Sequence, residues 1–454
     1  MEGTKYLTEE AILERGKEIK GIPLGLVDKT GRLATGKGAV GTVIEESWFG
    51  YKPNPEAEPD FPEAGVELKA TPYIHTEHGI RAKERLVCNI IDYMQEYDKT
   101  FDTSAFWHKC KAMLLMSYEY IKGRAKTDIT IDEVVLFKFP EEDLEIIKRD
   151  WEIIRSKIAA GKAHEISEGD TMYLAACTKG ANASSVRKQP RSDILAKQRA
   201  YSLKSSYMTS VLNRFIFGSE QNERIIKDVH KLKEKSFEDI LVEQLTPYFG
   251  KTQEELKKLF GVESTAKNLN ELLLAKMLGL KGKLAYTDEF VKANIVPKTI
   301  NVNPNGSVTE SMSFPTFDFI ELDNEGRYGW EQSTLYNYLA PTRFFFIIFQ
   351  KNDNGESVFE RVKFWNIPND DLDEVGIVWK RTVDTIHKGV TITKTPRGYS
   401  NDLPKRLESR VAHVRPHGKD SRDTLPLPTG GQLTKQCFWL NNTYIAEQIS
   451  KGSE

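Results

Sequence analysis

The sequence predicts a mixed α/β protein built from two domains, each with a central mixed sheet flanked by helices. Its 454 residues suit two or three domains of ordinary size, and a composition of 39% hydrophobic and 29% charged residues is typical of globular proteins. Amphipathic helical stretches and apolar or alternating strand-like stretches both occur along the chain. The two halves also share a weak internal repeat, which indicates that one domain plan occurs twice.

Local patterns justify the elements in order. Residues 8–22 predict a helix capped by Thr8, and residues 37–48 lead into a second helical stretch. Alternation over residues 64–72 predicts a strand, and residues 86–92 and 113–121 predict further strands of the same sheet. The helical and strand predictions continue with an amphipathic helix over 141–158 and a buried strand over the apolar run 344–349.

A charged, apolar-poor stretch at residues 219–236 predicts a linker between a domain at 1–218 and a domain at 237–454. The repeat supports this division. Gly50 precedes the pair Asp60-Phe61 by ten positions, and Gly279 precedes the pair Glu289-Phe290 by ten positions.

Charge and cysteine usage exclude several classes of protein. The net charge of -2 excludes a uniformly basic nucleic-acid coat, but it allows a basic groove on a neutral body. The four cysteines lie far apart without zinc-ligand spacing, so neither a zinc site nor a disulfide framework is expected. The first residues lack an apolar signal segment and the longest apolar run is too short to span a bilayer, so we expect a soluble cytoplasmic protein without membrane contact.

The most informative pattern is Asp60 followed by Glu67-Leu68-Lys69. Side chains alternate along a strand, so Glu67 and Lys69 project from the same face, and Asp60 can meet Glu67 across the start of the hairpin. Carboxylates with water and a phosphate oxygen suit Mg²⁺, and the lysine can orient the attacking water and offset charge on the phosphorane. The pattern therefore predicts a metal-dependent nuclease site.

Glu45 ends the preceding helix and supplies a third carboxylate. Its neighbour Glu46 is the alternative. Helical spacing places Glu45 on the face of Gly41 and Trp48, which favours Glu45 over Glu46 as the third metal ligand.

Residues 176–204 form a polar, basic stretch with a single acidic residue, Asp193. Such a stretch suits phosphate contacts and bidentate arginine–guanine pairs in the major groove. The DNA-contacting candidates in it are Lys179, Asn182, Arg187, Arg191, Arg199, Tyr201 and Lys204.

The first half as a whole resembles the MutH family of DNA endonucleases. The matching residues are Lys37-Gly38-x-x-Gly41-x-x-x-Glu45, Asp60-Phe61-x-x-x-Gly65-Val66-Glu67-Leu68-Lys69-x-Thr71-Pro72, His108-Lys109, Asp150-Trp151-Glu152, Lys179-Gly180-Ala181-Asn182 and Leu203-Lys204. In size and two-part build the chain is similar to the GATC-cutting type II restriction endonucleases of this family, of the staphylococcal type.

The resemblance implies two restriction-endonuclease-like domains around a DNA cleft and Mg²⁺-dependent cleavage of duplex DNA at 5′-GATC-3′, leaving 5′-phosphate ends. It assigns the acidic positions to Glu45, Asp60 and Glu67, and the lysines to Lys69 and Lys109, with Lys111 as the alternative to Lys109. The family's DNA-contacting run begins with an arginine where this chain has Cys177, so the base reader is left open among Arg187, Arg191 and Arg199.

The second half predicts a DNA-binding effector domain with a degenerate active site. Val296 stands at the position of Glu67, and only Glu289 and Lys298 remain of the nuclease pattern. The DNA-facing candidates Arg415, Lys419 and Lys435 persist. One carboxylate holds Mg²⁺ poorly, so we expect this half to bind a second DNA site as an allosteric effector.

The sequence thus predicts a prokaryotic type II restriction endonuclease that engages two sites at once, through a DNA-induced dimer or loop. A cognate methyltransferase belongs to the same restriction-modification system but is not a bound partner. Two alternatives are a strand-nicking mismatch-repair endonuclease of the same family and a non-catalytic GATC-binding regulator.

Overall fold

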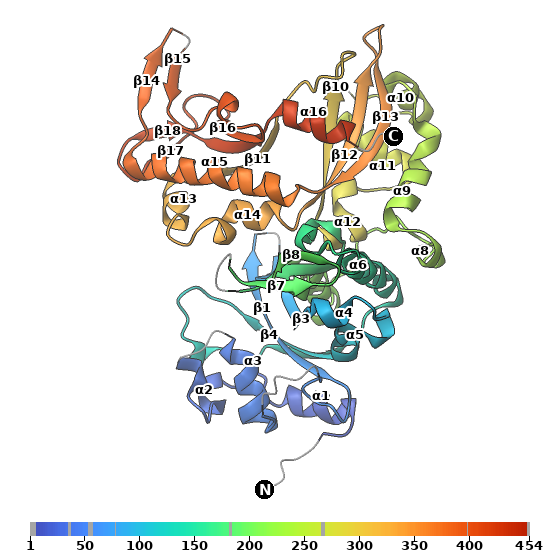
Figure 1. Ribbon diagram of the computed structural model, residues 1–454, viewed down its shortest axis with the longest axis vertical. Helices are drawn as coiled ribbons and strands as arrows, with labels where there is room; N and C mark the ends of the chain where they lie inside the picture. Colours follow the sequence, from blue (N-terminus) through green and yellow to red (C-terminus); the bar gives the residue numbers. More distant parts are fainter. Residues whose placement is uncertain are drawn as a thin grey trace. The chain divides into compact units, whose positions relative to one another are not determined.

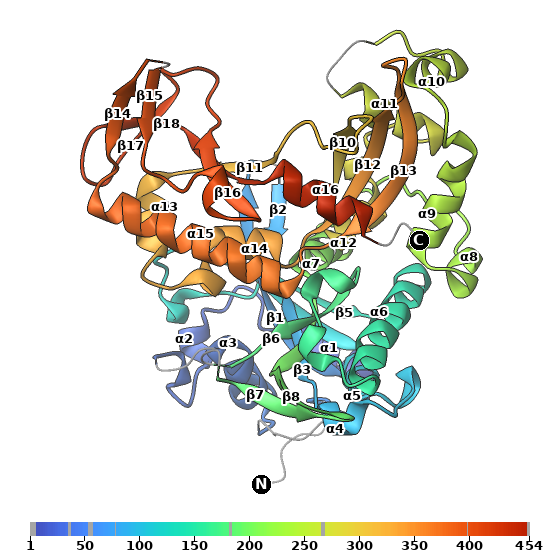
Figure 2. The same cartoon turned by 45° about the horizontal axis from the view of Figure 1, so that its top comes forward.

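The computed structural model describes residues 6–34, 38–52, 58–77, 79–180, 184–264, 268–396 and 398–451. The chain forms two compact units (Figures 1 and 2). The first unit contains residues 1–240 and 285–295, and the second contains residues 241–284 and 296–454. Within the described ranges, no helix has both the length and the apolar character that a bilayer crossing requires.

The first unit has short helices around two small sheets and a strand hairpin. Its strands are β1 (Glu67–Thr76), β2 (Gly79–Ala82), β3 (Leu86–Ile90), β4 (Met113–Glu119), β5 (Glu133–Phe137), β6 (Leu174–Thr178), β7 (Val186–Gln189), β8 (Ser192–Lys197) and β9 (Arg199–Leu203). Its helices are α1 (Glu9–Lys17), α2 (Leu24–Val27), α3 (Ala39–Val43), the π-helix η2 (Ile44–Phe49), α4 (Tyr93–Glu96), α5 (Ala105–Cys110), α6 (Glu141–Ala159), α7 (Ser205–Val211), α8 (His230–Glu234) and α12 (Asp288–Ala293).

The sheet that carries the site has the strand order β2-β1-β4-β5. Strands β1 and β4 are parallel, with Glu67 opposite Met113, and the remaining pairs are antiparallel. Strands β3, β9 and β6 form a separate antiparallel sheet, and β7 and β8 form a hairpin. A core of aliphatic and aromatic side chains from α1, α3, η2, β1, β4 and β5 packs beneath the first sheet, and Ile12, Phe61 and Leu114 are fully buried within it.

The second unit repeats this plan. Its strands are β10 (Ile295–Val302), β11 (Met312–Phe317), β12 (Arg343–Lys351), β13 (Ser357–Trp365), β14 (Ile392–Thr395), β15 (Gly398–Asn401), β16 (Ala412–Pro416), β17 (Thr424–Pro426), β18 (Gln432–Thr434) and β19 (Gln436–Leu440). Its helices are α10 (Gln253–Phe260), α11 (Leu269–Met277), α13 (Phe319–Glu325), α14 (Thr334–Leu339), α15 (Asn369–Lys388) and α16 (Asn442–Ser450), while α9 (Phe237–Leu245) runs across the boundary between the units.

The strand orders β10-β12-β13 and β11-β19-β16 correspond to β1-β4-β5 and β3-β9-β6 of the first unit, and the hairpin β17–β18 corresponds to β7–β8. The long helix α15 occupies the chain position of α6 (Figure 1). This correspondence supports the internal repeat that the sequence indicates.

The predicted mixed α/β class is confirmed. Thr8 caps α1 by accepting the N–H of Ala11, and the helix at 141–158 and the strand at 344–349 are present as α6 and β12. The prediction of one sheet for all three early strands is wrong for residues 86–92. Strand β3 pairs with β9 instead of β1 or β4, because β2 and the turn after it lead the chain away from the first sheet.

Residues 219–236, the predicted linker, lie within the first unit. They contain α8, and Ile225, Ile226 and Leu232 are buried there. The segment 285–295 also belongs to this unit, and Glu289 accepts the backbone N–H groups of Ile225 and Ile226 at 3.1 and 2.9 Å. Residues 219–236 contain few apolar residues, which suggested a linker. The apolar side chains of Ile225, Ile226 and Leu232 are nevertheless buried.

Candidate active site

A tight turn brings Asp60 and Glu67 together. Phe61 and Val66 exchange both backbone hydrogen bonds, and Gly65 adopts a positive φ of 67° that closes the turn before β1. Asp60 then lies beside the first residue of the strand. Its backbone N–H donates to Glu67 Oε2 at 3.2 Å, and its Oδ2 accepts the N–H of Leu68 at 2.9 Å. The sequence-predicted meeting of these two acids across the hairpin is therefore present in the structure.

Glu45 comes from the π-helix η2, which continues α3. Single π-turns widen a helix and often occur at functional sites. Here Glu45 lines the same pocket as Asp60 and Glu67, whereas Glu46 forms an ion pair with Arg32 at 2.8 Å. The geometry accordingly favours Glu45 over its neighbour.

Two lysines converge on Glu67, whose side chain is only 2% exposed. Lys69, two positions along β1, places its Nζ 2.8 Å from Glu67 Oε1 and 3.3 Å from the carbonyl oxygen of Cys88. Lys109 reaches the same carboxylate oxygen from α5 at 3.4 Å. Lys111 is exposed and packs against Gly65 instead, so the structure favours Lys109 over this alternative.

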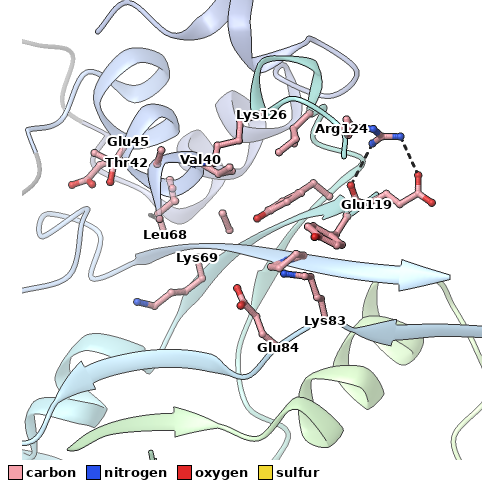
Figure 3. Close-up of a pocket in the computed structure, with 18 of the residues that line it drawn as sticks. Val40, Thr42, Glu45, Leu68, Lys69, Lys83, Glu84, Glu119, Arg124 and Lys126 are labelled. Carbon is pink, nitrogen blue, oxygen red and sulfur yellow. Dashed lines mark hydrogen bonds and ion pairs between the residues drawn. The ribbon is translucent and has the colours of Figure 1, made fainter. Parts of the chain in front are cut away.

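A pocket of about 570 Å³ contains Glu45, Asp60, Glu67 and Lys69. Figure 3 shows Glu45 on its helical side, with Leu68 and Lys69 on β1. Burial, with the charges of Asp60 and Glu67, raises the pKa of Glu45 to about 7, and burial also raises the pKa of Glu67. Burial opposes the charge on Lys69, but attraction to Glu67 outweighs it and raises the pKa of the ammonium group. The three acids therefore repel one another in a site that favours added positive charge.

The carboxylates are neighbours, but they are not arranged as a finished metal cage. In the part of the chain that the structure describes, no three acidic, histidine or cysteine side chains converge closely enough to hold a metal ion. Instead of a metal ion, the ammonium groups of Lys69 and Lys109 contact Glu67 Oε1.

Sequence reasoning missed basic residues on the far side of the pocket. Lys83, Arg124 and Lys126 line it together with the acids. Arg124 pairs with Glu119 at 3.5 Å, and the amine of Lys83 lies 3.9 Å above the ring of Tyr120. These residues are scattered in turns after β2 and β4, so no local spacing in the sequence singles them out.

The predicted DNA-contacting residues divide into two groups. Arg187 and Arg191 are exposed on the hairpin β7–β8, and Lys179 is half-buried directly after β6. Asn182 lies outside the described residues.

The other three candidates, Arg199, Tyr201 and Lys204, are buried, and each makes hydrogen bonds in the interior. Arg199 donates to the carbonyl oxygens of Ala176 and Ile166, and Tyr201 donates to Glu96 at 3.2 Å. Lys204 donates to the carbonyl oxygen of Thr171. All three lie in or directly after β9, which is buried on both faces. Arg199 and Lys204 therefore satisfy backbone carbonyl oxygens of the core, and Tyr201 satisfies the carboxylate of Glu96.

The second unit lacks the acids of the site. Leu274 and Ala275 are buried in α11, and Val296 is the second residue of β10, the strand that corresponds to β1. Lys298 contacts the carbonyl oxygen of Ser313 at 3.5 Å, and burial lowers its pKa. The remaining acid of the pattern, Glu289, is fully buried in the first unit and is used for backbone hydrogen bonds.

The DNA-facing candidates of the second unit lie near its β16–β19 sheet. Arg415 is exposed on β16, with its guanidinium 4.3 Å from the ring centre of Trp439. Lys419 is exposed in the following turn, and Lys435 pairs with Asp423 at 2.8 Å.

The buried Glu67 beside the half-buried Asp60, with one lysine from β1 and one from α5 in a mixed α/β unit, is an arrangement typical of nucleases of the restriction-endonuclease kind. Comparison with known proteins agrees. The family model of the DNA mismatch repair enzyme MutH matches residues 49–150. The type II restriction enzyme Sau3AI of Staphylococcus aureus is 40% identical, with 98% of this chain and 99% of that protein aligned.

The chain therefore belongs to the family of the type II restriction enzyme Sau3AI and is a restriction endonuclease. The mismatch repair proteins MutH of Shewanella woodyi and Escherichia coli are 29% and 27% identical, and each aligns with 46% of this chain and more than nine-tenths of its own length. About half of this chain therefore lies outside its alignment with each of these MutH proteins.

Proposed function

We propose that the enzyme recognises duplex 5′-GATC-3′ and hydrolyses a phosphodiester bond with Mg²⁺ at the pocket of Glu45, Asp60 and Glu67. The observation that carries this proposal is the convergence of these acids with Lys69 in one pocket of the first unit, where Lys109 reaches Glu67 Oε1 from α5. The near-full-length relative, a type II restriction enzyme by name, supports the reaction class.

The residues present fit a magnesium ion. Carboxylate oxygens are its preferred protein ligands, and few are needed because the ion keeps several waters. Burial, together with the charges of neighbouring carboxylates, raises the pKa of Glu45 and Glu67, so added positive charge would favour their ionised forms. When bound, the ion would polarise the scissile phosphate and acidify a bound water.

The chain's own side chains then position the reaction. Lys69 is held against Glu67, so its ammonium group can orient a water molecule in line with the phosphorus and stabilise charge on the phosphorane. Lys109 adds a second cation from α5. Water forms the new P–O bond, the P–O3′ bond breaks, and a proton passes to the leaving 3′ oxygen. The products carry a 5′-phosphate and a 3′-hydroxyl.

DNA contacts would come from Lys179, Arg187 and Arg191 in the first unit and from Arg415, Lys419 and Lys435 in the second. The second unit keeps exposed basic groups while lacking the acids, which supports a role as an effector that binds a second site. We expect the enzyme to act in the bacterial cytoplasm beside a cognate methyltransferase, and to form a dimer or loop on DNA with two sites.

Plasmid digestion with sequenced ends tests the proposal. Unmethylated plasmid with Mg²⁺ is treated with wild type, Glu67→Ala and Lys69→Ala, with Lys111→Ala as the matched control. Discrete ends at GATC from wild type and Lys111→Ala alone are expected. Ends at another sequence would overturn the specificity, and equal cleavage by Glu67→Ala would overturn the assignment of the site.

A second substrate tests the effector role. Plasmids with one or two GATC sites are compared, and a short GATC duplex is added to the one-site plasmid. Faster cleavage of the two-site plasmid, and stimulation by the added duplex, are expected. Equal rates without stimulation would contradict the effector role while leaving the catalytic proposal intact.

A further inference from the structure

The second unit carries a hairpin that the repeated plan does not explain. Strands β14 and β15 lie in the connection between α15 and β16. The corresponding connection of the first unit, residues 160–173, is fully described and contains only the short 3-10 turns Ala163–Glu165 and Glu168–Asp170. The hairpin is therefore an addition to the second unit, the unit that lacks the catalytic acids.

One face of this hairpin gathers a cation and apolar groups. Lys394 is paired directly opposite Tyr399, and Ile392 is paired opposite Asn401. Directly opposed side chains share a face, and alternation along each strand puts both pairs on the same side. Tyr399 is 77% exposed and Ile392 is 42% exposed, so neither packs into the core.

The hairpin itself contributes no acidic side chain. Residues 388–401 contain no aspartate or glutamate. The first acid after them, Asp402, accepts the backbone N–H of Thr391 at 3.0 Å at the base of the hairpin. An exposed ammonium group beside an exposed aromatic ring suits a polyanion with stacking surfaces, because the amine meets phosphate and the ring packs on sugar or base.

The position of the hairpin fits the same partner. A Cβ on Gly389, just before β14, would lie 3.4 Å from Thr429 Oγ1, in the turn between β17 and β18. Figures 1 and 2 both show the two hairpins at one end of the second unit. The hairpin β17–β18 corresponds to β7–β8, which carries the exposed Arg187 and Arg191 in the first unit.

We infer that β14–β15 is a DNA-contacting arm of the second unit, with Lys394 on a backbone phosphate and Tyr399 against the sugar or an adjoining base. The inference rests on the proposed effector role and extends it, because it names an element of the second unit that contacts the second duplex. The arm acts on binding and takes no part in the chemical step.

The test uses the full chain with Glu67→Gln, which blocks cleavage, and a fluorescent GATC duplex titrated at several salt concentrations. Lys394→Ala should lower the salt slope of second-duplex binding by about 0.9, the loss of one phosphate contact. Tyr399→Ala should weaken that binding roughly 5- to 100-fold without changing the slope. Lys394→Arg should restore the slope. Lys351→Ala, an exposed lysine on β12 of the same unit, is the matched control.

The outcomes separate the two proposals. If only one duplex binds per chain before any arm substitution, the effector role itself fails. If two bind and the arm variants behave like Lys351→Ala, the arm proposal is refuted and the effector role stands. If the arm variants change only the oligomeric state without DNA, the arm is a protein contact and the DNA assignment is overturned.

Discussion

A buried ion pair ties the segment 285–295 into the catalytic unit, and one substitution can break it. Lys292 Nζ lies 2.8 Å from Asp143 Oδ1 and 2.8 Å from Asp288 Oδ2, and the lysine side chain is 2% exposed. Tyr207 also donates to Asp143 at 3.1 Å. Lys292→Met keeps most of the side-chain volume and removes the charge, so two carboxylates remain buried without their cation.

The expected loss is about 3–5 kcal/mol, the usual cost of removing one partner from a buried pair. A unit of this size loses roughly 2–4 °C of melting temperature per kcal/mol, so Tm should fall by about 6–20 °C. Burial already raises the pKa of Asp143, and loss of Lys292 should raise it further. A buried acid with a raised pKa favours the folded state at low pH and destabilises it as pH rises through that pKa.

The assay is thermal unfolding of the full chain at pH 5.5 and pH 8. The variant should be less stable than wild type at both values, with the larger deficit at pH 8. Lys162→Met is the control, because its ion pair with Glu165 at 3.5 Å is exposed and should contribute less than about 1 kcal/mol. A Lys292→Met variant within 1 kcal/mol of wild type at pH 8 would refute the assignment of residues 285–295 to the catalytic unit.

Three further predictions concern the site and its surroundings. With the pKa of Glu45 raised to about 7 by burial and by its acidic neighbours, apparent Mg²⁺ affinity should fall about tenfold per pH unit below 7, as measured by Mg²⁺ titration of cleavage at pH 6 and pH 8. Lys109→Ala should lower the single-turnover cleavage rate by about 10- to 1,000-fold with duplex affinity retained, and an unchanged rate would contradict its role. Arg199→Ala should cost about 1–3 kcal/mol of stability and leave the salt slope of DNA binding unchanged, whereas Arg187→Ala should lower the slope by about 0.9 at constant stability.

The catalytic constellation could be predicted because it is local. Asp60, Glu67 and Lys69 lie within one hairpin, and strand alternation alone places the last two on the same face. The choice of Glu45 over Glu46 followed from helical spacing, although the segment is a π-helix whose wider turn the sequence does not reveal. The prediction that Lys109 belongs to the site depended on the family resemblance. This lysine lies on a helix from another segment, and no sequence spacing links it to Glu67.

Composition does not reveal which residues of the predicted DNA-contacting set are buried. A basic stretch with interleaved polar residues looks like a solvated loop, yet β9 pairs on both sides and becomes central in its sheet. Arg199 and Lys204 therefore donate hydrogen bonds to buried carbonyl oxygens.

The domain plan shows a similar limit. The repeat indicated two units, and matching strand orders support it. That residues 285–295 belong to the first unit could not be predicted from the sequence, because this placement depends on long-range contacts. The two strongest are Glu289 with the backbone of Ile225 and Ile226, and Lys292 with Asp143.

The central claim is that one active site, in the first unit, performs all strand cleavage. Single-turnover cleavage of a GATC duplex with Mg²⁺ by Glu67→Gln, and by Lys298→Ala at the position of the second unit that corresponds to Lys69, tests this directly. We expect a loss of at least about 100-fold for Glu67→Gln and an unchanged chemical step for Lys298→Ala. Cleavage that survives Glu67→Gln, or that Lys298→Ala abolishes while DNA binding persists, would contradict it.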